Sequence, residues 1–340
     1  MGGAAAMTTI LYPEAMYPDD AEERRILGPD ATILRRDTKV LADLSDADCA
    51  AVDGLMLFRQ FCTADDLARF PKLRAIVRMG VGYDRIDRAA AAARGITVCN
   101  VPDYGTTEVA DHAMALVLAL RRGIVLHHEW QRRTPPEPWR GADHPLLRRS
   151  GTQGFGIVGM GRIGTAVALR AKAFGFRVTI YDPHLPNGAE LAVGVARART
   201  LHELMRGADV LSIHTPLTPD TARLVNAAAL ALLPPGAVVV NTARGPVLDV
   251  AALADAMREG RVAGAGLDVL PVEPPVEPLP ELLRAYRARE AWVEGRLIIT
   301  PHSAYLTPEA HWDIRVKSAE TMWAALMSNE PQNVIPPESF

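Results

Sequence analysis

Short runs of apolar, often β-branched residues alternate with segments of helical period along nearly the whole chain. This alternation is typical of α/β proteins with parallel sheets. In the first hundred residues the predicted strands are Thr9–Leu11, Thr32–Leu34, Leu55–Phe58, Ala75–Val77 and Thr97–Cys99. After residue 150 they are Phe155–Val158, Arg177–Tyr181, Val210–His214, Val238–Asn241, Gly264–Asp268 and Leu297–Thr300. The pattern therefore predicts two α/β units.

A long helix is predicted between the two series of strands. Its apolar face consists of Val109, Ala113, Leu116 and Leu120, and Arg121 and Arg122 suit its carboxyl end. Two more helices are predicted after Asn226 and Asp249, because both residues are good N-caps. Residues 127–150 interrupt the pattern with four prolines and five arginines. They are predicted to form a long ordered arm or a linker.

Composition excludes several classes of protein. The 340 residues are 49% apolar and 23% charged, which is the balance of a globular protein rather than a disordered one. The net charge of −3 does not favour binding to nucleic acid. The arginines around the arm are interrupted by prolines and acids, so a solvated surface is favoured for them too. They are Arg121, Arg122, Arg132, Arg133, Arg140, Arg148 and Arg149.

Neither a membrane span nor a disulfide framework is expected. The longest nearly uncharged apolar stretch, Ala113–Leu120, is far shorter than the roughly 20 residues that cross a bilayer. The three cysteines, Cys49, Cys62 and Cys99, include no CxxC pair. Such sparse cysteines suit a reducing compartment, so we expect a cytoplasmic protein without a Cys-based metal site.

The most informative motif is glycine-rich and lies between a predicted strand and a predicted helix. Gly159, Gly161 and Gly164 have the GxGxxG spacing, with Arg162 and Ile163 between the last two. The glycines allow a tight turn and close approach of the backbone to a pyrophosphate at the helix N-terminus. The helix face is predicted to consist of Ile163, Val167, Ala171 and Phe174, with Gly175 as the stop.

Asp182 ends the next predicted strand, where a carboxylate accepts hydrogen bonds from the adenosine ribose. No Arg or Lys follows it directly, so NAD is favoured over NADP. The alternative is a glycine-rich turn without a ligand. A phosphate-binding P-loop would need Lys after Gly164, where Thr165 stands. A zinc-protease motif starting at His128 fails because Arg132 occupies the second ligand position, and no metal is expected.

Four chemically active side chains follow the carboxyl ends of other predicted strands. They are Arg244, Asp268, Glu273 and His302. Open α/β sheets bind ligands at this edge. Any one of these residues is more often structural than functional. Together they supply a guanidinium that grips a carboxylate, a proton donor, and a carboxylate that keeps the donor charged.

These motifs, in this order, resemble the D-isomer-specific 2-hydroxyacid dehydrogenase family. The similarity runs from about Leu55 to Asn333, and residues 161–176 and 181–183 most resemble the C-terminal-binding-protein-like branch. The residues that carry the resemblance are Arg78-Met-Gly-Val-Gly82, Asp182, Thr242-Ala-Arg244-Gly, Asp268 with Glu273, and Thr300-Pro-His302.

The resemblance implies a role for each matching residue. Arg244 would orient the substrate, His302 would be the acid/base, and Glu273 would hold the imidazole. The substrate carboxylate would be received by Arg78 and the backbone of Met79, Gly80, Val81 and Gly82. Tyr305 departs from the family's pattern, and its ring is predicted either to lie near the substrate's side chain or to pack between the domains. The cofactor would be bound by Thr215, Pro216, Thr242, Ala243 and Asp268, the last on its carboxamide, in addition to the glycine-rich loop and Asp182.

The resemblance also implies two Rossmann-like or flavodoxin-like parallel-sheet domains joined by long helices. Residues 1–102 plus 303–340 would form a discontinuous substrate-binding domain, and 103–302 an NAD-binding domain. A dimerisation arm at about 121–150 would make the protein a homodimer. The segment between Glu273 and His302 is longer than expected for the family and is predicted to be a charged helix near the cofactor rim.

The expected activity is NAD-dependent interconversion of a small 2-keto acid and a D-2-hydroxy acid, with no nucleic acid or membrane as partner. Two alternatives stay open. One is an NAD(H)-sensing dimeric scaffold with low turnover, as in corepressors. The other is a phosphoglycerate dehydrogenase that lacks a regulatory domain. The sequence does not name the substrate, because a pocket discriminates weakly between acids that differ by one methylene.

Overall fold

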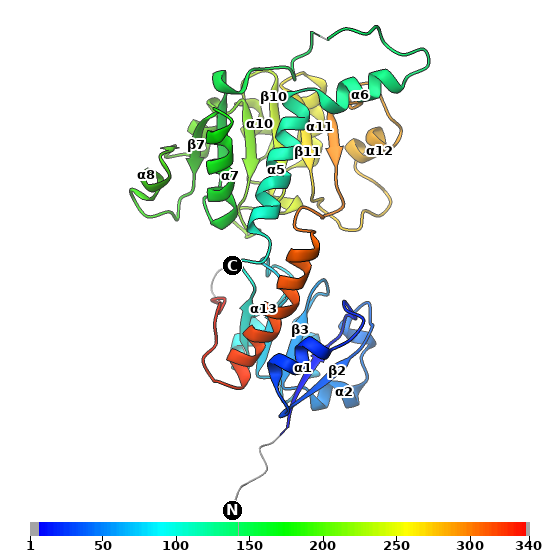
Figure 1. The fold of residues 1–340 in the computed structure, drawn as a ribbon, viewed down its shortest axis with the longest axis vertical. Helices are drawn as coiled ribbons and strands as arrows, with labels where there is room; N and C mark the ends of the chain where they lie inside the picture. The colour runs from blue at the N-terminus through cyan, green and yellow to red at the C-terminus, as the bar shows by residue number, and fades with distance from the viewer. Residues whose placement is uncertain (1–6, 142, 338–340) are drawn as a thin grey trace, which may run out of the picture. The chain divides into compact units, whose positions relative to one another are not determined.

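The computed structural model describes residues 7–141 and 143–337, which form two compact units. Unit 1 is Met1–Gly105 with Leu306–Phe340, and unit 2 is Thr106–Tyr305. Each is built on one parallel sheet (Figure 1). The division falls after Gly105 and Tyr305 rather than after residues 102 and 302. At the second junction this is because the turn that follows β12 is hydrogen-bonded to Asp268 of unit 2.

Unit 1 has a five-stranded sheet in the order β2-β1-β3-β4-β5. Its strands are β1 (Thr8–Tyr12), β2 (Ala31–Arg35), β3 (Gly54–Leu57), β4 (Ala75–Arg78) and β5 (Thr97–Asn100). Its helices are α1 (Ala21–Leu27), α2 (Asp46–Ala51), α3 (Ala64–Ala68), α4 (Arg88–Ala93) and α13 (Pro308–Leu326). All five predicted strands are confirmed to within one residue at each end.

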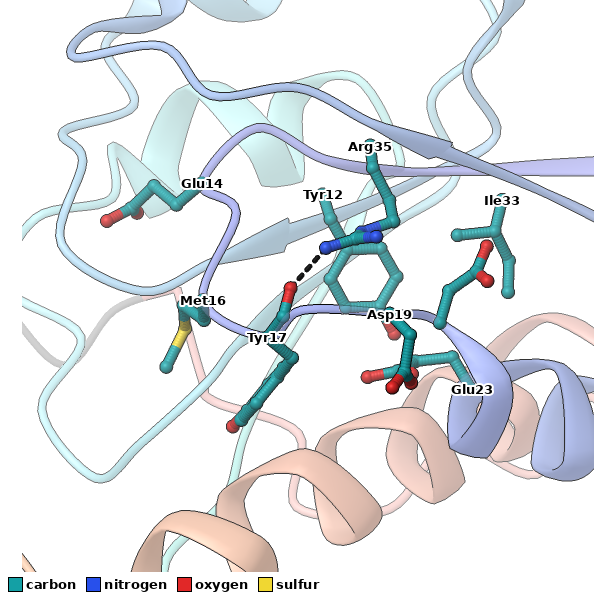
Figure 2. Close-up of a pocket in the computed structure, with 9 residues that line it drawn as sticks. Tyr12, Glu14, Met16, Tyr17, Asp19, Glu23, Ile33 and Arg35 are labelled. Atoms are coloured by element: carbon teal, nitrogen blue, oxygen red, sulfur yellow. Dashed lines mark hydrogen bonds between the residues drawn. The ribbon is translucent and has the colours of Figure 1, made fainter.

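Helix α13 crosses the five-stranded sheet and packs beside α1 (Figure 1). A buried ion pair joins the two helices, because Arg315 donates from Nε and Nη2 to the Glu23 carboxylate at 2.8 and 2.7 Å. Figure 2 shows a neighbouring cavity of about 10 Å³, lined by Tyr12, Glu23, Arg35 and others. It has room for about one water molecule. It is therefore too small to be a substrate site.

Unit 2 has a seven-stranded sheet in the order β12-β11-β10-β9-β6-β7-β8. The strands are β6 (Gly154–Val158), β7 (Arg177–Tyr181), β8 (Ala196–Arg197), β9 (Val210–Ile213), β10 (Ala237–Asn241), β11 (Val262–Leu267) and β12 (Leu297–Ile299). The helices are α5 (Thr106–Arg121), α6 (Ile124–Arg132), α7 (Arg162–Ala173), α8 (Ala189–Val193), α9 (Leu201–Arg206), α10 (Ala227–Ala231), α11 (Val250–Arg258) and α12 (Glu281–Arg287). Six of these strands were predicted to within two residues, and the short edge strand β8 was missed.

Two apolar cores cover the two faces of this sheet. Helices α5 and α7 lie on one face (Figure 1), and α9, α10, α11 and α12 contribute to the other core. Successive strand residues alternate between the cores: Val238 and Val240 belong to one, and Val239 to the other. The predicted N-caps are confirmed, since Asn226 and Asp249 both accept backbone N–H groups of the helices that follow them.

Two predictions about helix faces are wrong. Phe174 does not continue the buried face of α7 but is 52% exposed, because the helix ends at Ala173. Arg121 does not belong to a solvated surface: it is 1% exposed, and burial lowers its pKa to about 10. It donates to the carbonyls of Asp209 and Gly236, next to the amino ends of β9 and β10. It thus ties the end of α5 to the sheet.

The arm and the long segment after Glu273 also differ from prediction. The arm region begins with a regular helix, α6, rather than irregular chain. Helix α12 exists, but its Glu281 pairs with Arg258 at the end of α11, next to the amino end of β11. The Glu294 carboxylate beyond it pairs with Arg133 after α6, at 2.6 Å. Helix α12 and Glu294 therefore lie toward the amino ends of the strands, opposite the glycine-rich edge, and the predicted place of this helix near the cofactor rim is wrong.

Candidate active site

The glycine-rich loop has the geometry of a dinucleotide-binding turn. Gly159 has φ +90°, and a Cβ there would lie 2.7 Å from the His214 carbonyl oxygen. A Cβ at Gly164 would lie 2.1 Å from the Gly159 oxygen. At Gly161, by contrast, no atom of the described residues other than those of the adjoining backbone lies within 4 Å of that position. The outer glycines thus permit close packing, while the middle one leaves open space at the N-terminus of α7, where a diphosphate is favoured.

Asp182 follows β7 and is fixed beside this loop. Its Oδ2 accepts from the Met160 N–H, and its Oδ1 from the His184 N–H, both at 2.9 Å. Each carboxylate oxygen has a second lone pair for a ribose hydroxyl. The backbone bonds hold the carboxylate in place before any ligand binds.

A cavity of about 510 Å³ opens beside Asp182 and is also lined by Arg197 and Arg199. Arg197 donates to the carbonyls of Asp182 and Leu185 at 2.9 Å, so it fixes the loop after β7. Sequence reasoning missed both arginines because it considered only the residues directly after Asp182. They reach the cavity from β8 and the residues after it, and the two-residue strand β8 leaves almost no periodic signal.

Two buried polar atoms lie at the carboxyl ends of β9 and β10 without a partner among the described residues. They are Nδ1 of His214 and Oγ1 of Thr242. Burial lowers the pKa of His214 to about 3, so its imidazole is neutral. An unsatisfied buried polar group costs about 1–3 kcal/mol. Polar atoms of this kind beside the glycine-rich loop fit a dinucleotide cofactor, which would offer them partners. Thr215 and Pro216 follow His214 directly.

Arg244 is positioned by the turn after β10. The buried Asn241 accepts from the Ala243 N–H at 3.0 Å and donates to the Arg244 carbonyl at 2.9 Å. The Arg244 guanidinium donates to the Ala243 carbonyl. Asn241 is a positioning residue that the sequence analysis did not single out, although it stands inside the Asn-Thr-Ala-Arg-Gly motif.

His302 and Glu273 are brought together as predicted. His302 Nδ1 lies 2.6 Å from Glu273 Oε2, and Glu273 Oε1 accepts from the Leu270 N–H at 2.9 Å. Because an ionised carboxylate only accepts, the pair places a proton on Nδ1. Nε2 is then the ring atom left to exchange a proton with a substrate. The imidazole is 36% exposed, so it is accessible.

Asp268 is buried and holds the turn that carries His302. It is 1% exposed, and its carboxylate accepts from Thr300 Oγ1, Ser303 N and Ala304 N at 2.6, 2.9 and 3.0 Å. These contacts hold the turn that carries His302. The geometry supports a positioning role for Asp268, and its contact with a cofactor carboxamide stays a prediction, since Oδ2 accepts one hydrogen bond among the described residues. Tyr305, 9% exposed, stands edge-on to His302 with ring centroids 6.5 Å apart.

The predicted carboxylate-binding loop lies in unit 1, after β4. Gly80 has φ +151°, and a Cβ there would collide with the Arg78 guanidinium, which folds over it. The N–H groups of Met79 and Gly80 donate to the carbonyls of Leu57 and Arg78 at 2.7 and 2.8 Å. These two amides are thus engaged within the protein. The Arg78 guanidinium donates to the Met79 carbonyl at 2.8 Å, and the binding of a carboxylate by this loop stays a prediction.

These features together define a dinucleotide-binding domain equipped for acid/base chemistry. They are the doubly wound sheet, the open glycine-rich turn, the fixed Asp182 and the pair formed by His302 and Glu273. The family model described as "D-isomer specific 2-hydroxyacid dehydrogenase, NAD binding domain" matches residues 114–304. The chain therefore belongs to the D-isomer-specific 2-hydroxyacid dehydrogenase family, as its motifs predicted, and unit 2 carries the family's NAD-binding domain.

Similar proteins agree with this family. D-3-phosphoglycerate dehydrogenase of Mycobacterium leprae is 38% identical over 325 residues, 92% of this chain and 54% of that protein. The chain thus spans about half the length of the curated relatives it matches. A glyoxylate reductase structure from Paecilomyes thermophila superposes with a TM-score of 0.83 at 26% identity, covering 98% and 99% of the two chains. D-lactate dehydrogenase from Aquifex aeolicus, complexed with NAD and lactic acid, gives 0.79 at 26%, covering 95% and 96%.

Within the part of the chain that the structure describes, no helix has the length and apolar character needed to cross a membrane.

Proposed function

We propose that this protein is an NAD-dependent dehydrogenase that interconverts a small 2-keto acid and the corresponding D-2-hydroxy acid. The observation that carries the proposal is the His302–Glu273 contact of 2.6 Å. It lies at the same edge of the seven-stranded sheet as the glycine-rich turn and Arg244, where a nicotinamide cofactor and an acid/base group are both needed.

The chain's own residues account for the other steps of the reaction. Bound NADH supplies the hydride that reaches the carbonyl carbon. As negative charge develops on the carbonyl oxygen, the Arg244 guanidinium stabilises it and His302 Nε2 gives it a proton. Glu273 holds the imidazole and stabilises its charged form. Arg78, with the amides of Val81 and Gly82, binds the substrate carboxylate.

NADH is the proposed cofactor in preference to NADPH. The fixed Asp182 carboxylate suits two ribose hydroxyls and repels a 2′-phosphate. Arg197 lines the same cavity, but its guanidinium donates to three backbone carbonyls and lies 3.6 Å from the Glu190 carboxylate. These contacts within the protein leave it a weak partner for a 2′-phosphate. Asp182 is therefore the residue that sets the preference.

Turnover on a panel of 2-keto acids tests the function. NADH oxidation would be followed with glyoxylate, hydroxypyruvate, pyruvate, phenylpyruvate, 2-keto-4-methylthiobutyrate and 3-phosphohydroxypyruvate, and repeated with NADPH. We expect robust turnover on at least one acid and a lower rate with NADPH. Tight NADH binding with negligible turnover on every acid would contradict the enzyme proposal and favour an NAD(H)-sensing scaffold, the property suggested by the C-terminal-binding-protein-like resemblance.

Phosphoglycerate dehydrogenase activity is the second candidate. The 38% identity to the Mycobacterium leprae enzyme favours it. It predicts that 3-phosphohydroxypyruvate gives the highest kcat/KM of the panel.

We further propose a cytoplasmic homodimer. Three free, buried cysteines suit a reducing compartment, and Trp139, 92% exposed in the arm, suits burial against a second copy.

Replacing Glu273 with Gln is expected to narrow the pH range of keto-acid reduction. The lost carboxylate no longer stabilises the imidazolium, so activity should fall on the alkaline side of the pH profile. The measurement is kcat against pH for wild type and variant, with Glu281→Gln on α12 as the control. A Glu273→Gln profile that coincides with wild type would contradict the role of Glu273.

A further inference from the structure

A second histidine lies next to the acid/base turn without having a part in the mechanism above. His112 stands in α5, and its Nε2 lies 3.0 Å from Oγ1 of Thr300. Thr300 directly follows β12 and precedes His302 by two residues. The His112 side chain is 24% exposed, so it is partly buried rather than part of the core or of the open surface.

The contacts around Thr300 determine which atom donates. The Asp268 carboxylate, when ionised, can only accept, so the 2.6 Å contact uses the Thr300 hydroxyl proton. The Thr300 oxygen must then accept from His112, which places a proton on His112 Nε2. The resulting chain of donors runs from His112 through Thr300 to Asp268. His112 Nε2 itself is 3.8 Å from Asp268 Oδ1.

This series of hydrogen bonds ends on a turn whose backbone is strained. His302 has φ +52°, a left-handed conformation that is unfavourable for a non-glycine residue and persists only where surrounding contacts hold it. The holding contacts come from the same network. The His302 N–H donates to the Asp268 carbonyl at 2.8 Å and the Thr300 carbonyl at 3.0 Å, and the Asp268 carboxylate accepts from Ser303 and Ala304.

We propose that His112 is a positioning residue for the acid/base histidine. Through Thr300 and Asp268 it keeps the turn from Thr300 to Ala304 in the conformation that aims His302 at the substrate. Helix α5 thus contributes to catalysis although it bears none of the groups that react. The inference rests on the proposed function for its kinetic effect, but the hydrogen-bond network stands independently of turnover.

Kinetics of three variants test the proposal. For His112→Ala and Thr300→Val we expect kcat on the best 2-keto acid to fall about 10- to 100-fold, because small misplacement of a reacting group is costly. The Kd for NADH, from the change in its fluorescence, should stay within about twofold. Thr300→Ser keeps the hydroxyl and should retain most of kcat. His127→Ala is the matched control, a half-buried helix histidine in the same unit.

NMR of the ¹⁵N-histidine-labelled protein supplies a readout that does not need turnover. We expect the His112 ring to carry its proton on Nε2 in wild type, and the His302 ring signals to shift in His112→Ala and Thr300→Val but not in His127→Ala. A kcat for His112→Ala equal to wild type, or a neutral His112 protonated only on Nδ1, would overturn the proposal. An inactive wild-type protein would instead contradict the proposed function. In that case the NMR result alone would show whether His112 and Thr300 hold the turn that carries His302.

Discussion

Replacing His302 with Asn is expected to lower kcat for keto-acid reduction by about 10²- to 10⁴-fold, the usual contribution of a general acid. Asparagine keeps a polar group at φ +52°, a conformation that Asn tolerates better than most residues. The turn should therefore survive. What is lost is the proton on Nε2, which neutralises the alkoxide as hydride arrives.

Steady-state kinetics and NADH binding separate this effect from misfolding. Because His302 touches Glu273 and Tyr305 rather than the glycine-rich turn, the Kd for NADH should stay within about twofold of wild type. His202→Asn, on the exposed side of α9, is the control and should leave both quantities unchanged. Wild-type kcat in His302→Asn would refute the acid/base assignment.

Replacing Arg244 with Ala is expected to lower kcat/KM for the keto acid by about 10²- to 10³-fold, comparable to removing one donor from an oxyanion site. In the proposed mechanism the guanidinium both binds the substrate and stabilises charge on the carbonyl oxygen, so kcat should fall and KM should rise. Arg244→Lys should recover only part of the loss, since an ammonium cannot form the planar bidentate contact.

The turn that bears Arg244 should survive the Arg244→Ala change. Asn241 holds it through the backbone of residues 243 and 244, and these contacts do not need the guanidinium. NADH binding and the thermal midpoint should thus stay near wild type. Arg206→Ala, a surface arginine of the same unit, is the control. Unchanged kcat/KM in Arg244→Ala would show that another cation orients the substrate.

Features written in short stretches of sequence were predicted well. The strands of both sheets, the caps at Asn226 and Asp249 and the glycine-rich turn depend on local periodicity and on residues a few positions apart. The pairing of His302 with Glu273 was also expected, because both residues follow strands whose carboxyl ends meet at one edge of the sheet, and the family motif joins them.

Features that depend on partners distant in the chain were missed or misplaced. Arg121 looked like a surface residue because its acceptors are carbonyls 88 and 115 residues away. Helix α12 was expected near the cofactor, yet its Glu281 pairs with Arg258 of α11, and Glu294 beyond the helix pairs with Arg133 after α6. The donors that surround Asp268 come from the turn after β12, and the sequence analysis did not foresee them.

The sequence by itself determined the fold class, the glycine-rich turn and the family, and it predicted the acid/base histidine, the carboxylate that holds it and the guanidinium, because each is encoded by local pattern or by motif. Only the tertiary structure decided how the acid/base turn is held. His112 and Thr300 are 188 residues apart. Their hydrogen bond arises from the packing of α5 against the sheet, which no local pattern in the chain encodes.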